Sequence, residues 1–547
     1  MLEAQIPENL AEEVRRRRTF AIISHPDAGK TTLTEKLLLY GGAVNLAGSV
    51  KARKNQAHAT SDWMELEKQR GISITSTVLS FDYQGYRLNL LDTPGHQDFS
   101  EDTYRTLVAV DCAVMILDAA KGLEAQTLKL FDVCKRRGIP LFTFVNKMDR
   151  PSQPPLDLLD EVERTLGLRT IPMNWPLGNG PSFRGVFDRR TREVHLFERV
   201  AHGSKAASVQ VMDPNSPEVE RLMDDQSAYK AFREELELLE MAGEEFDAEA
   251  FATGRLTPVY FGSAVSNFGV QLFLDQFLDL APQPAARRTD GEPVLPQSPE
   301  FSGFVFKIQA DMNPRHRDRV AFMRICSGQF ERGMKVQCVR TGATIRLSYP
   351  QQLFAQERQT VEEAYAGDVV GLVNSGELYL GDTLLGGGKK FRFEPIPLFP
   401  PEHFARVTLV DPSRRKAFQR ALDQLSHEGA VQIFYLTDGH SRDVVMGAVG
   451  RLQFEVVQYR IKNDYSVDCR FEVLPFQLCR WLEGPPDSLA KFSPTRTTRL
   501  AVDPDNRPVA LFPGQWDLDY TAEKNPDLIF HSVNPKGLQA PVTEEED

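Results

Sequence analysis

The sequence lacks the features that mark secreted, zinc-binding or membrane proteins. Its 6 cysteines are widely spaced and none form a C-x-x-C pair, which argues against a structural zinc site or a thioredoxin motif and fits a reducing cytosol. No stretch of about 18 uncharged apolar residues occurs, and the N-terminus has no apolar core of a signal peptide. We therefore expect a cytoplasmic protein that contacts no membrane.

Positive charge is also in deficit. Lysine and arginine number 64 against 76 aspartates and glutamates, so the formal net charge is -12. Proteins that coat DNA or free RNA usually carry the opposite sign, so any contact with RNA must come from local basic patches. A chain of 547 residues is too long for one hydrophobic core, and its length predicts three or four domains.

The first half of the chain alternates short apolar runs with helical patterns. The runs are Phe20–Ile23, Leu88–Leu91, Ala113–Leu117 and Leu141–Val145. Nearly continuous apolar runs of this length are typical of strands buried on both faces of a parallel sheet. We predict a doubly wound α/β domain with a mostly parallel sheet over residues 1–285. An insertion at about residues 170–255 interrupts it and contains a charged amphipathic helix over Tyr229–Met241.

A Pro-rich linker at residues 282–299 precedes a change of pattern. Short alternating strands with turn glycines predict a β-barrel over residues 300–392. A second Pro-rich bridge leads to residues 400–530, where helical and strand patterns mix and predict an α+β domain, with one of its helices over Leu452–Tyr459. Residues 531–547 form an acidic C-terminal tail, and we expect its end, Thr543–Asp547, to be disordered.

A phosphate-binding loop is predicted where the first strand turns into a helix. Its residues are Ser24, His25, Pro26, Asp27, Ala28, Gly29, Lys30, Thr31 and Thr32. Backbone N–H groups of such a loop face phosphate oxygens. Lys30 would reach the β- and γ-phosphates, and Thr31 would place its hydroxyl on Mg²⁺. Ser24 replaces the usual first glycine, and the motif alone does not separate GTP from ATP.

A second phosphate-facing turn follows the run Leu88–Leu91. It consists of Asp92, Thr93, Pro94 and Gly95, with His96 directly after it. Asp92 suits an indirect contact to Mg²⁺ through water, and Gly95 lets a backbone N–H approach the γ-phosphate. His96 could orient the attacking water, although a lone histidine is more often structural. An isolated turn of this kind could be an ordinary β-turn; its position downstream of the phosphate-binding loop favours a functional role.

The run Asn146-Lys147-Met148-Asp149 discriminates between bases. The Asp149 carboxylate can accept hydrogen bonds from guanine N1–H and the 2-amino group, whereas adenine offers neither donor in that arrangement. Asn146 would tie this loop to the phosphate-binding loop, and the stem of Lys147 would lie along the base. The motifs in this order predict GTP and GDP as the nucleotides.

Two shorter segments complete the predicted site. The first is an Arg-Gly-Ile-Ser-Ile loop, whose Ser73 hydroxyl would bind Mg²⁺ and sense the γ-phosphate, with Thr75 and Thr77 as neighbouring alternatives. The second contains Ser263 and Ala264, which follow the last strand of the domain. A backbone N–H there can meet guanine O6, although the segment alone would be an ordinary turn.

With these motifs in place, the chain resembles the translational GTPases. A histidine after Asp-Thr-Pro-Gly and the Arg-Gly-Ile-Ser-Ile loop separate that family from Ras-like and heterotrimeric GTPases. The resemblance implies that the ribosome positions His96, and that Asp27 helps to hold a monovalent cation near the phosphates. Longer runs resemble the release-factor branch of the family, in which serine is usual at the position of Ser24. These runs are Ile22–Thr32, Ser61–Ile74, Gly303–Ala310 and Gly450–Tyr459.

The resemblance also implies a function and partners. The protein would hydrolyse GTP on the ribosome and promote the departure of a class I release factor after the peptide is freed, acting as a monomer in solution. Basic residues of the C-terminal part would contact the ribosome, although solvated surface charge explains any one of them equally well. They are Arg414, Arg415, Lys416, Arg442, Arg451, Arg496 and Arg499.

Two alternative functions share the same motifs. A translocase-like or ribosomal-protection GTPase is one, but we expect the chain to lack the two further domains with which a translocase reaches the decoding centre. A nucleotide-gated adaptor that never hydrolyses GTP is the other, and His96 argues against it.

Overall fold

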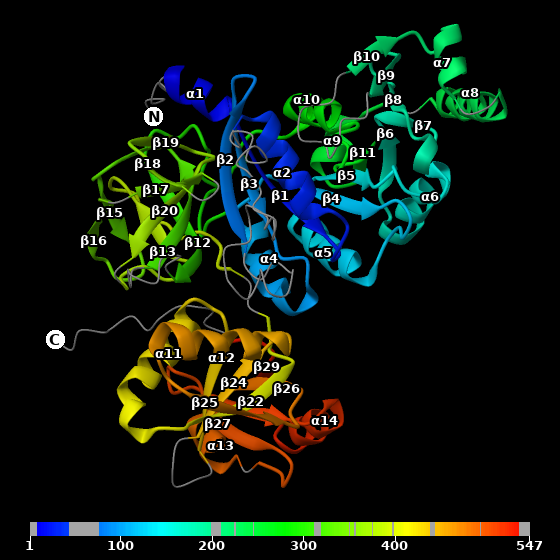
Figure 1. The fold of residues 1–547 in the computed structure, drawn as a ribbon. Helices are drawn as coiled ribbons and strands as arrows, with labels where there is room; N and C mark the ends of the chain where they lie inside the picture. The colour runs from blue at the N-terminus through cyan, green and yellow to red at the C-terminus, as the bar shows by residue number, and fades with distance from the viewer. Residues whose placement is uncertain are drawn as a thin grey trace.

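The computed structural model describes residues 8–42, 76–197, 209–223, 226–243, 245–310, 319–348, 350–354, 357–374, 376–396, 399–437, 443–492 and 494–534. Within these ranges the chain builds three bodies, each around its own sheet or barrel (Figure 1). The predicted α/β multidomain fold is thereby confirmed. None of the described helices is long and apolar enough to cross a membrane.

The first body, which we call the G domain, is built on a seven-stranded sheet in the order β2-β3-β1-β4-β5-β11-β6. Its strands are β1 (Arg17–Ser24), β2 (Thr77–Tyr83), β3 (Tyr86–Asp92), β4 (Cys112–Asp118), β5 (Leu141–Asn146), β6 (Arg169–Pro172) and β11 (Leu256–Phe261). All neighbours pair in parallel except β2, which forms an antiparallel hairpin with β3. The four predicted apolar runs lie in β1, β3, β4 and β5.

Helices cover both faces of this sheet, which explains why its central strands are apolar throughout. The helices are α1 (Glu8–Arg15), α2 (Lys30–Tyr40), α4 (Ser100–Leu107), α5 (Ala125–Arg137), α6 (Pro155–Leu166) and α10 (Val270–Leu280), with a 3₁₀ turn η1 (Gln97–Phe99) before α4. Alternate residues of β1 enter different cores. Phe20 and Ile22 pack with α2 and α10, whereas Ala21 and Ile23 pack with α1, α4 and α5.

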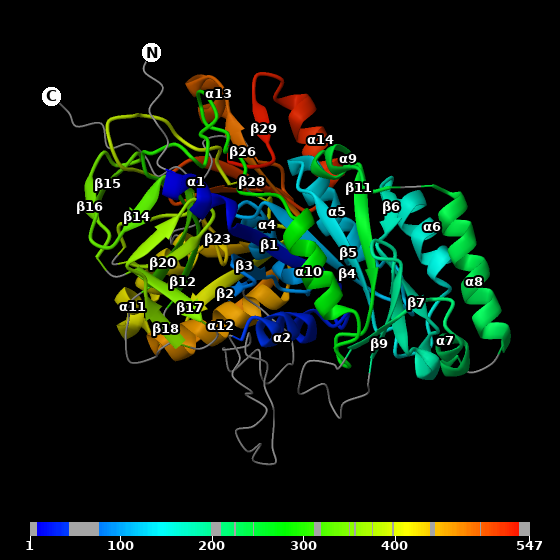
Figure 2. The same ribbon diagram turned by 90° about the horizontal axis from the view of Figure 1, so that it is seen from above.

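The insertion forms a small sheet of its own, in the antiparallel order β10-β9-β8-β7. Its elements are β7 (Asn174–Leu177), η2 (Gly180–Ser182), β8 (Gly185–Asp188), β9 (Glu193–Phe197), β10 (Val209–Met212), α7 (Pro217–Leu222), α8 (Gln226–Met241) and α9 (Ala248–Ala252). The predicted helix over Tyr229–Met241 lies within α8. Residues 170–172 still belong to the main sheet through β6. The insertion lies on the opposite side of the G domain from the barrel (Figure 2).

The second body is the predicted β-barrel, in which all strand pairs are antiparallel. Its strands are β12 (Ser302–Ala310), β13 (Arg319–Ser327), β14 (Gln329–Glu331), β15 (Lys335–Cys338), β16 (Thr344–Arg346), β17 (Pro350–Phe354), β18 (Glu357–Thr360), β19 (Glu363–Tyr365), β20 (Val369–Asn374) and β21 (Thr383–Leu385). Its core is continuous with that of the G domain, because α4 and α5 residues cluster with barrel residues such as Phe304 and Phe322.

The third body is an eight-stranded antiparallel sheet in the order β25-β22-β24-β23-β27-β28-β26-β29. Its strands are β22 (His403–Leu409), β23 (Gln432–Leu436), β24 (Val444–Ala448), β25 (Cys469–Leu474), β26 (Leu478–Glu483), β27 (Arg499–Val502), β28 (Pro508–Phe512) and β29 (Ile529–His531). Its helices are η4 (Pro412–Arg414), α11 (Arg415–His427), α12 (Leu452–Tyr465), α13 (Pro486–Lys491) and α14 (Gln515–Lys524). Helices α11 and α12 lie side by side over one half of the sheet (Figure 1).

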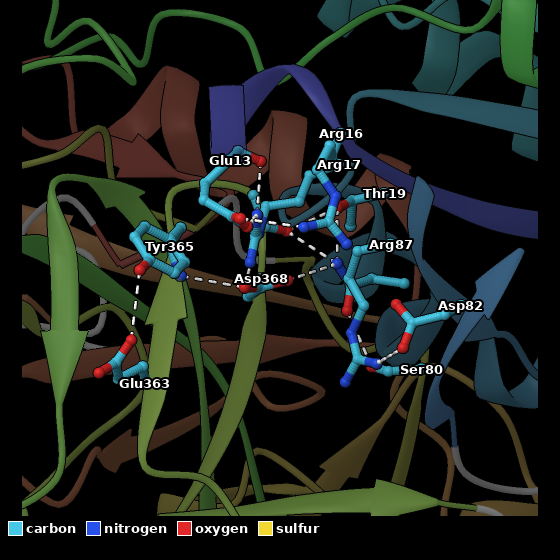
Figure 3. A network of polar contacts seen from close by, with 12 residues as sticks. Glu13, Arg16, Arg17, Thr19, Ser80, Asp82, Arg87, Glu363, Tyr365 and Asp368 are labelled. Atoms are coloured by element: carbon cyan, nitrogen blue, oxygen red, sulfur yellow. Dashed lines mark hydrogen bonds and ion pairs between the residues drawn. The ribbon is translucent and has the colours of Figure 1, made fainter. Parts of the chain in front are cut away.

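Buried polar contacts join the G domain to the barrel (Figure 3). Arg17 Nε donates to Asp368 Oδ2 at 2.7 Å, and Asn89 Nδ2 donates to Asp368 Oδ1 at 3.1 Å. Thr19 Oγ1 donates to the Gly367 carbonyl at 2.6 Å. The Arg17 guanidinium also lies over the Tyr365 ring. Because charged groups are rarely buried without partners, these contacts fix one orientation of the barrel on the G domain.

Candidate functional site

The phosphate-binding loop connects the end of β1 to the start of α2. Asp27 and Gly29 both adopt positive φ, at 66° and 96°, and Gly29 caps the helix. Successive turns of this kind direct backbone N–H groups into one concavity, which binds anions. A Cβ on Gly29 would come closer than 3.0 Å to Asn146 Nδ2. The loop therefore requires glycine at this position for both its conformation and its packing.

Lys30 and Asp92 meet at the floor of the loop. The parallel register pairs Ile22 of β1 with Asp92 of β3, so Asp92 ends its strand beside the loop. Lys30 Nζ lies 2.6 Å from Asp92 Oδ1, and both side chains are buried. Asp92 Oδ2 is buried and has no hydrogen-bond partner among the described residues. Such an acceptor is suited to a water molecule on Mg²⁺.

The turn after β3 lies directly against the phosphate-binding loop. Thr93 Oγ1 donates to the Ile22 carbonyl at 2.6 Å, and Thr103 Oγ1 of α4 donates to the Pro94 carbonyl at 3.3 Å. A Cβ on Gly95 would lie 3.6 Å from Pro26 Cα. The two backbones thus lie in close contact here. The predicted approach of the Gly95 N–H to a γ-phosphate stays a prediction.

Asn146 ties three loops together. Its Nδ2 donates to the Ala28 carbonyl at 2.8 Å, and its Oδ1 accepts from the Ala264 N–H at 2.9 Å. The loop after β5 is fastened further where Met148 N–H donates to the Gly262 carbonyl at 3.1 Å. Ser263, next in the chain, is fully buried. The structure therefore brings together the phosphate loop and both segments predicted to contact guanine.

Asp149 carries an open acceptor beside these loops. Its Oδ1 is buried and has no hydrogen-bond partner among the described residues. A buried acceptor without a donor is costly, and the two adjacent donors of guanine would satisfy it. The residues present therefore fit a guanine nucleotide.

Asp118 is a residue of this site that the sequence interpretation missed. It ends β4 and pairs in register with Asn146. Its Oδ2 accepts from Lys147 Nζ at 2.8 Å, and the same ammonium donates to the Asp27 carbonyl. Burial raises the pKa of Asp118, but the hydrogen bonds from Lys147 and from the Ala120 N–H, together with the charge of Lys147, outweigh it, so this pKa lies below its usual value. A carboxylate directly after an apolar run, as at Asp92, is the signal that could have found it.

His25 is held inside the loop rather than facing solvent. Its Nδ1 lies 2.7 Å from Glu124 Oε2, and its side chain is buried. Burial lowers the pKa of His25 more strongly than Glu124 raises it. The imidazole is therefore neutral at physiological pH and supports the loop without adding charge.

His96 points toward Asp98 in the η1 turn. Asp98 N–H donates to His96 Nδ1 at 3.2 Å, and the side chain of His96 is 30% exposed. A neutral imidazole that accepts at Nδ1 carries its proton on Nε2. Asp98 Oδ2 in turn accepts from the Leu452 N–H of α12 at 2.7 Å. The third body therefore contacts the chain two residues beyond His96.

The remaining predicted residues lie as follows. Thr31 and Thr32 are half-buried in the first turn of α2, and Asp27 is exposed at the loop. Ser73 lies outside the described residues, as do Thr75 and Arg442. The other basic residues predicted to contact the ribosome are exposed or half-buried on the third body; they are Arg414, Arg415, Lys416, Arg451, Arg496 and Arg499.

Comparison with protein families gives three matches in chain order. The Elongation factor Tu GTP binding domain matches residues 15–283, and Elongation factor G domain 2 matches residues 300–387. The model described as Class II release factor RF3, C-terminal domain, matches residues 393–522.

Similar proteins extend over nearly the whole chain. Peptide chain release factor 3 of Trichodesmium erythraeum (strain IMS101) is 55% identical over 534 residues, which is 98% of both chains. The protein of the same name from Microcystis aeruginosa (strain NIES-843) is 56% identical over 524 residues, 96% of both chains. A crystal structure from Thermus thermophilus shares the fold with a TM-score of 0.67 at 24% identity, covering 90% of this chain and 73% of its own.

Proposed function

This chain belongs to the peptide chain release factor 3 family of translation termination, and we propose that it uses GTP hydrolysis on the ribosome to release a class I release factor once the peptide has been freed. Its GTP-binding domain is that of a translational GTPase, so the protein is a GTP hydrolase. The match of the C-terminal part to the release-factor domain argues against a translocase-like GTPase.

The open acceptor on Asp149 is the observation that carries the nucleotide assignment. Asn146 holds the loop of Asp149 against the phosphate-binding loop and against Ala264. One side of the site thus offers an acceptor for guanine donors, and the other offers N–H groups and Lys30 for phosphate. This combination supports GTP and GDP over adenine nucleotides.

The polar residues at the phosphate end have distinct proposed roles. Lys30 would exchange its contact with Asp92 for the β- and γ-phosphates. Thr31 and Ser73 would ligate Mg²⁺ directly, and Asp92 would contact it through water. Mg²⁺ would neutralise charge on the phosphates. Asp27 would take part in binding a monovalent cation.

His96 is proposed as the catalytic residue. With Nδ1 accepting from Asp98, Nε2 carries the proton and would donate a hydrogen bond to the attacking water or to a γ-phosphate oxygen. Accepting a proton from the water would require the other tautomer, and therefore loss of the Asp98 contact. We infer that the ribosome changes this turn when it stimulates hydrolysis.

The partners proposed for this chain are the ribosome and a class I release factor, with the chain acting as a cytoplasmic monomer. The exposed basic residues at Arg414, Arg415, Lys416, Arg451 and Arg496 support a ribosome contact. Local groups of exposed basic residues can bind RNA although the net charge of the chain is negative.

Replacing His96 tests both the reaction and its dependence on the ribosome. We expect His96→Ala to retain GTP binding and to lose about a hundredfold or more of ribosome-stimulated hydrolysis, because a group oriented on developing charge is removed. His531→Ala is the matched control, since its side chain is also 30% exposed and also contacts a carboxylate. GTP turnover should be measured with the protein alone, with ribosomes, and with ribosomes that hold a class I factor after peptide release.

Each alternative gives a different result in this experiment. Unchanged ribosome-stimulated turnover in His96→Ala would show that His96 is not catalytic. Wild-type protein that binds GTP and releases the class I factor without hydrolysis would be a nucleotide-gated adaptor. Hydrolysis without release of the class I factor would contradict the proposed role in termination.

A further inference from the structure

Three ion pairs with largely buried side chains join the G domain to the barrel within the described ranges. They are Arg17–Asp368 at 2.7 Å, Arg324–Asp111 at 2.6 Å and Lys307–Asp102 at 3.3 Å. In the first two pairs, Arg17 begins β1 and Asp111 immediately precedes β4, on the side of the sheet remote from the phosphate-binding loop. Asp102 instead lies in α4, the helix that follows His96. The third pair therefore connects the barrel to the part of the G domain that faces the γ-phosphate.

Lys307 and Asp102 together hold Ser76. Lys307 Nζ donates to the Ser76 carbonyl at 2.5 Å. Asp102 Oδ2 accepts from the Ser76 N–H at 2.6 Å and also from the Ser76 hydroxyl. The same hydroxyl lies 2.7 Å from Thr106 Oγ1. All three polar groups of Ser76 are thus fixed by α4 and the barrel, three residues after Ser73 in the chain.

The same helix also holds the turn that contains Gly95. Thr103, the neighbour of Asp102, donates its hydroxyl hydrogen bond to the Pro94 carbonyl at 3.3 Å. One short helix therefore fixes the turn at Gly95 and, through Asp102, fixes Ser76, the residue before β2. Lys307 is the barrel residue that completes this arrangement.

The charge of Lys307 is needed to keep Asp102 ionised inside the interface. Burial opposes ionisation of Asp102, but the Lys307 ammonium and the hydrogen bonds from Ser76 outweigh it, and the pKa of Asp102 lies below its usual value. Without the ammonium, a buried carboxylate would lose its main compensation. Asp102 would then move or take up a proton, and both would loosen its contacts to Ser76.

We propose that Lys307 is a positioning residue through which docking of the barrel increases the preference of the G domain for GTP over GDP. Contacts to a γ-phosphate form only when two parts of the G domain are in place: the turn at Gly95, and Ser76 at the entry to β2. GDP has no γ-phosphate and is indifferent to their position, so the interaction of Lys307 favours the GTP-bound state alone. This inference rests on the proposed binding of GTP.

Lys307→Met tests the inference because it keeps the length of the side chain and removes its charge. Binding of GDP and of a non-hydrolysable GTP analogue should be measured on the full chain. We expect the ratio of analogue affinity to GDP affinity to fall about tenfold, with GDP affinity unchanged. Lys307→Arg, which keeps the charge, should restore most of the ratio. A residue that merely stabilised the fold would affect both nucleotides alike.

Arg324→Met is the matched control. It removes a buried cation from the same interface, where Asp111 keeps a second contact to Arg287. This variant should leave the nucleotide ratio unchanged. An equal effect of Lys307→Met and Arg324→Met on the ratio, or no effect of either, would overturn the inference.

A second substitution keeps the test usable if Lys307→Met does not fold. Asp102→Asn retains an acceptor for Ser76 and removes the charge that Lys307 contacts, so it should lower the same ratio. An unchanged ratio in this variant would also overturn the inference. Wild-type protein that fails to bind the GTP analogue would instead contradict the proposed function.

Discussion

At the scale of single residues, the site is defined by carboxylate and amide side chains at strand ends. Asp92 and Asp118 end β3 and β4, and Asn146 ends β5. Parallel strands bring their carboxyl ends to one edge of the sheet, so these side chains meet although they are distant in sequence. Two of them contact lysines of the loops, Lys30 and Lys147. The nucleotide would therefore enter a site in which Asp92 and Asp118 already have cationic partners.

Asp149→Asn tests the reading of the base. We expect GTP affinity to fall at least about tenfold, because a hydrogen bond to a charged group contributes about 1.5–3 kcal/mol and the amide presents a donor where guanine also donates. Xanthine has an acceptor in place of the 2-amino group, so xanthosine triphosphate should bind this variant better than GTP does. Asp157→Asn, at an exposed aspartate of α6, is the control. Unaltered GTP affinity in Asp149→Asn would contradict the assignment.

The sequence could predict these side chains only as far as local motifs reach. Asn146 was expected to tie its loop to the phosphate loop, and its hydrogen bond to Ala28 does so. The pairing of Lys147 with Asp118 could not be read locally, because 29 residues separate them. The orientation of His96 toward Asp98 depends on a turn that no motif specifies. Ser73 stays a prediction because it lies outside the described residues.

At the scale of elements, η1 and α4 form the attachment point of the third body. Leu452 N–H donates to Asp98 Oδ2 at 2.7 Å, and Arg105 Nη1 donates to the Gly429 carbonyl at 3.0 Å. Tyr104 stacks on Phe399 of the bridge to the third body, with ring centroids 4.2 Å apart. These contacts all come from residues within nine positions of His96. A change in the conformation of this turn would therefore alter the contacts that hold the third body.

Gly450→Ala tests this attachment. A Cβ at Gly450 would come closer than 3.0 Å to Asp98, including its Cα, so η1 and the start of α12 must separate. We expect a less compact molecule in small-angle X-ray scattering and weaker ribosome-stimulated hydrolysis, with GTP binding retained. Gly514→Ala is the control in the same body, because its Cβ would meet nothing within 4 Å. Identical scattering of the two variants would show that this contact does not hold the third body in place.

Helices and strands could be predicted from the sequence where the local pattern of apolar residues matched the faces that are buried. They could not be predicted where a strand depends on pairing with a segment far away in the chain. The runs in β1, β3, β4 and β5 were evident because both of their faces are covered. Helix α12 was expected over Leu452–Tyr459 but continues to Tyr465, since Ile461 is fully buried and Arg460 contacts Glu428 at 2.7 Å. The strands β25 to β29 are short, and their positions in the sheet depend on partners that no local pattern reveals.

At the scale of the whole molecule, the barrel is held on the G domain by a shared core and by buried charge pairs. The core alone is not directional, whereas the pair Arg17–Asp368 requires one orientation. Tyr365 N–H donates to the same carboxylate at 3.0 Å (Figure 3). Asn89 donates to its other oxygen at 3.1 Å. The proposed coupling through Lys307 depends on this fixed arrangement, because a barrel free to tilt would not hold Ser76.

Removing Asp368 should therefore weaken the whole assembly. Burial raises the pKa of Asp368, but the charge of Arg17 and the Tyr365 N–H outweigh it and hold this pKa below its usual value. The ionised form is thus favoured by folding, so its contribution to stability is complete above about pH 4 and is lost as pH falls through the lower pKa of the folded state.

At neutral pH, Asp368→Ala leaves Arg17 buried with one carboxylate fewer, and we expect a loss of about 3–5 kcal/mol of stability. Denaturant unfolding monitored between pH 7 and pH 3 measures both effects, and the variant should lose less stability on acidification than the wild type. Glu362→Ala breaks an exposed pair with Arg332 in the barrel and should change stability by less than about 1 kcal/mol. Equal losses in the two variants would mean that the core alone fixes the barrel.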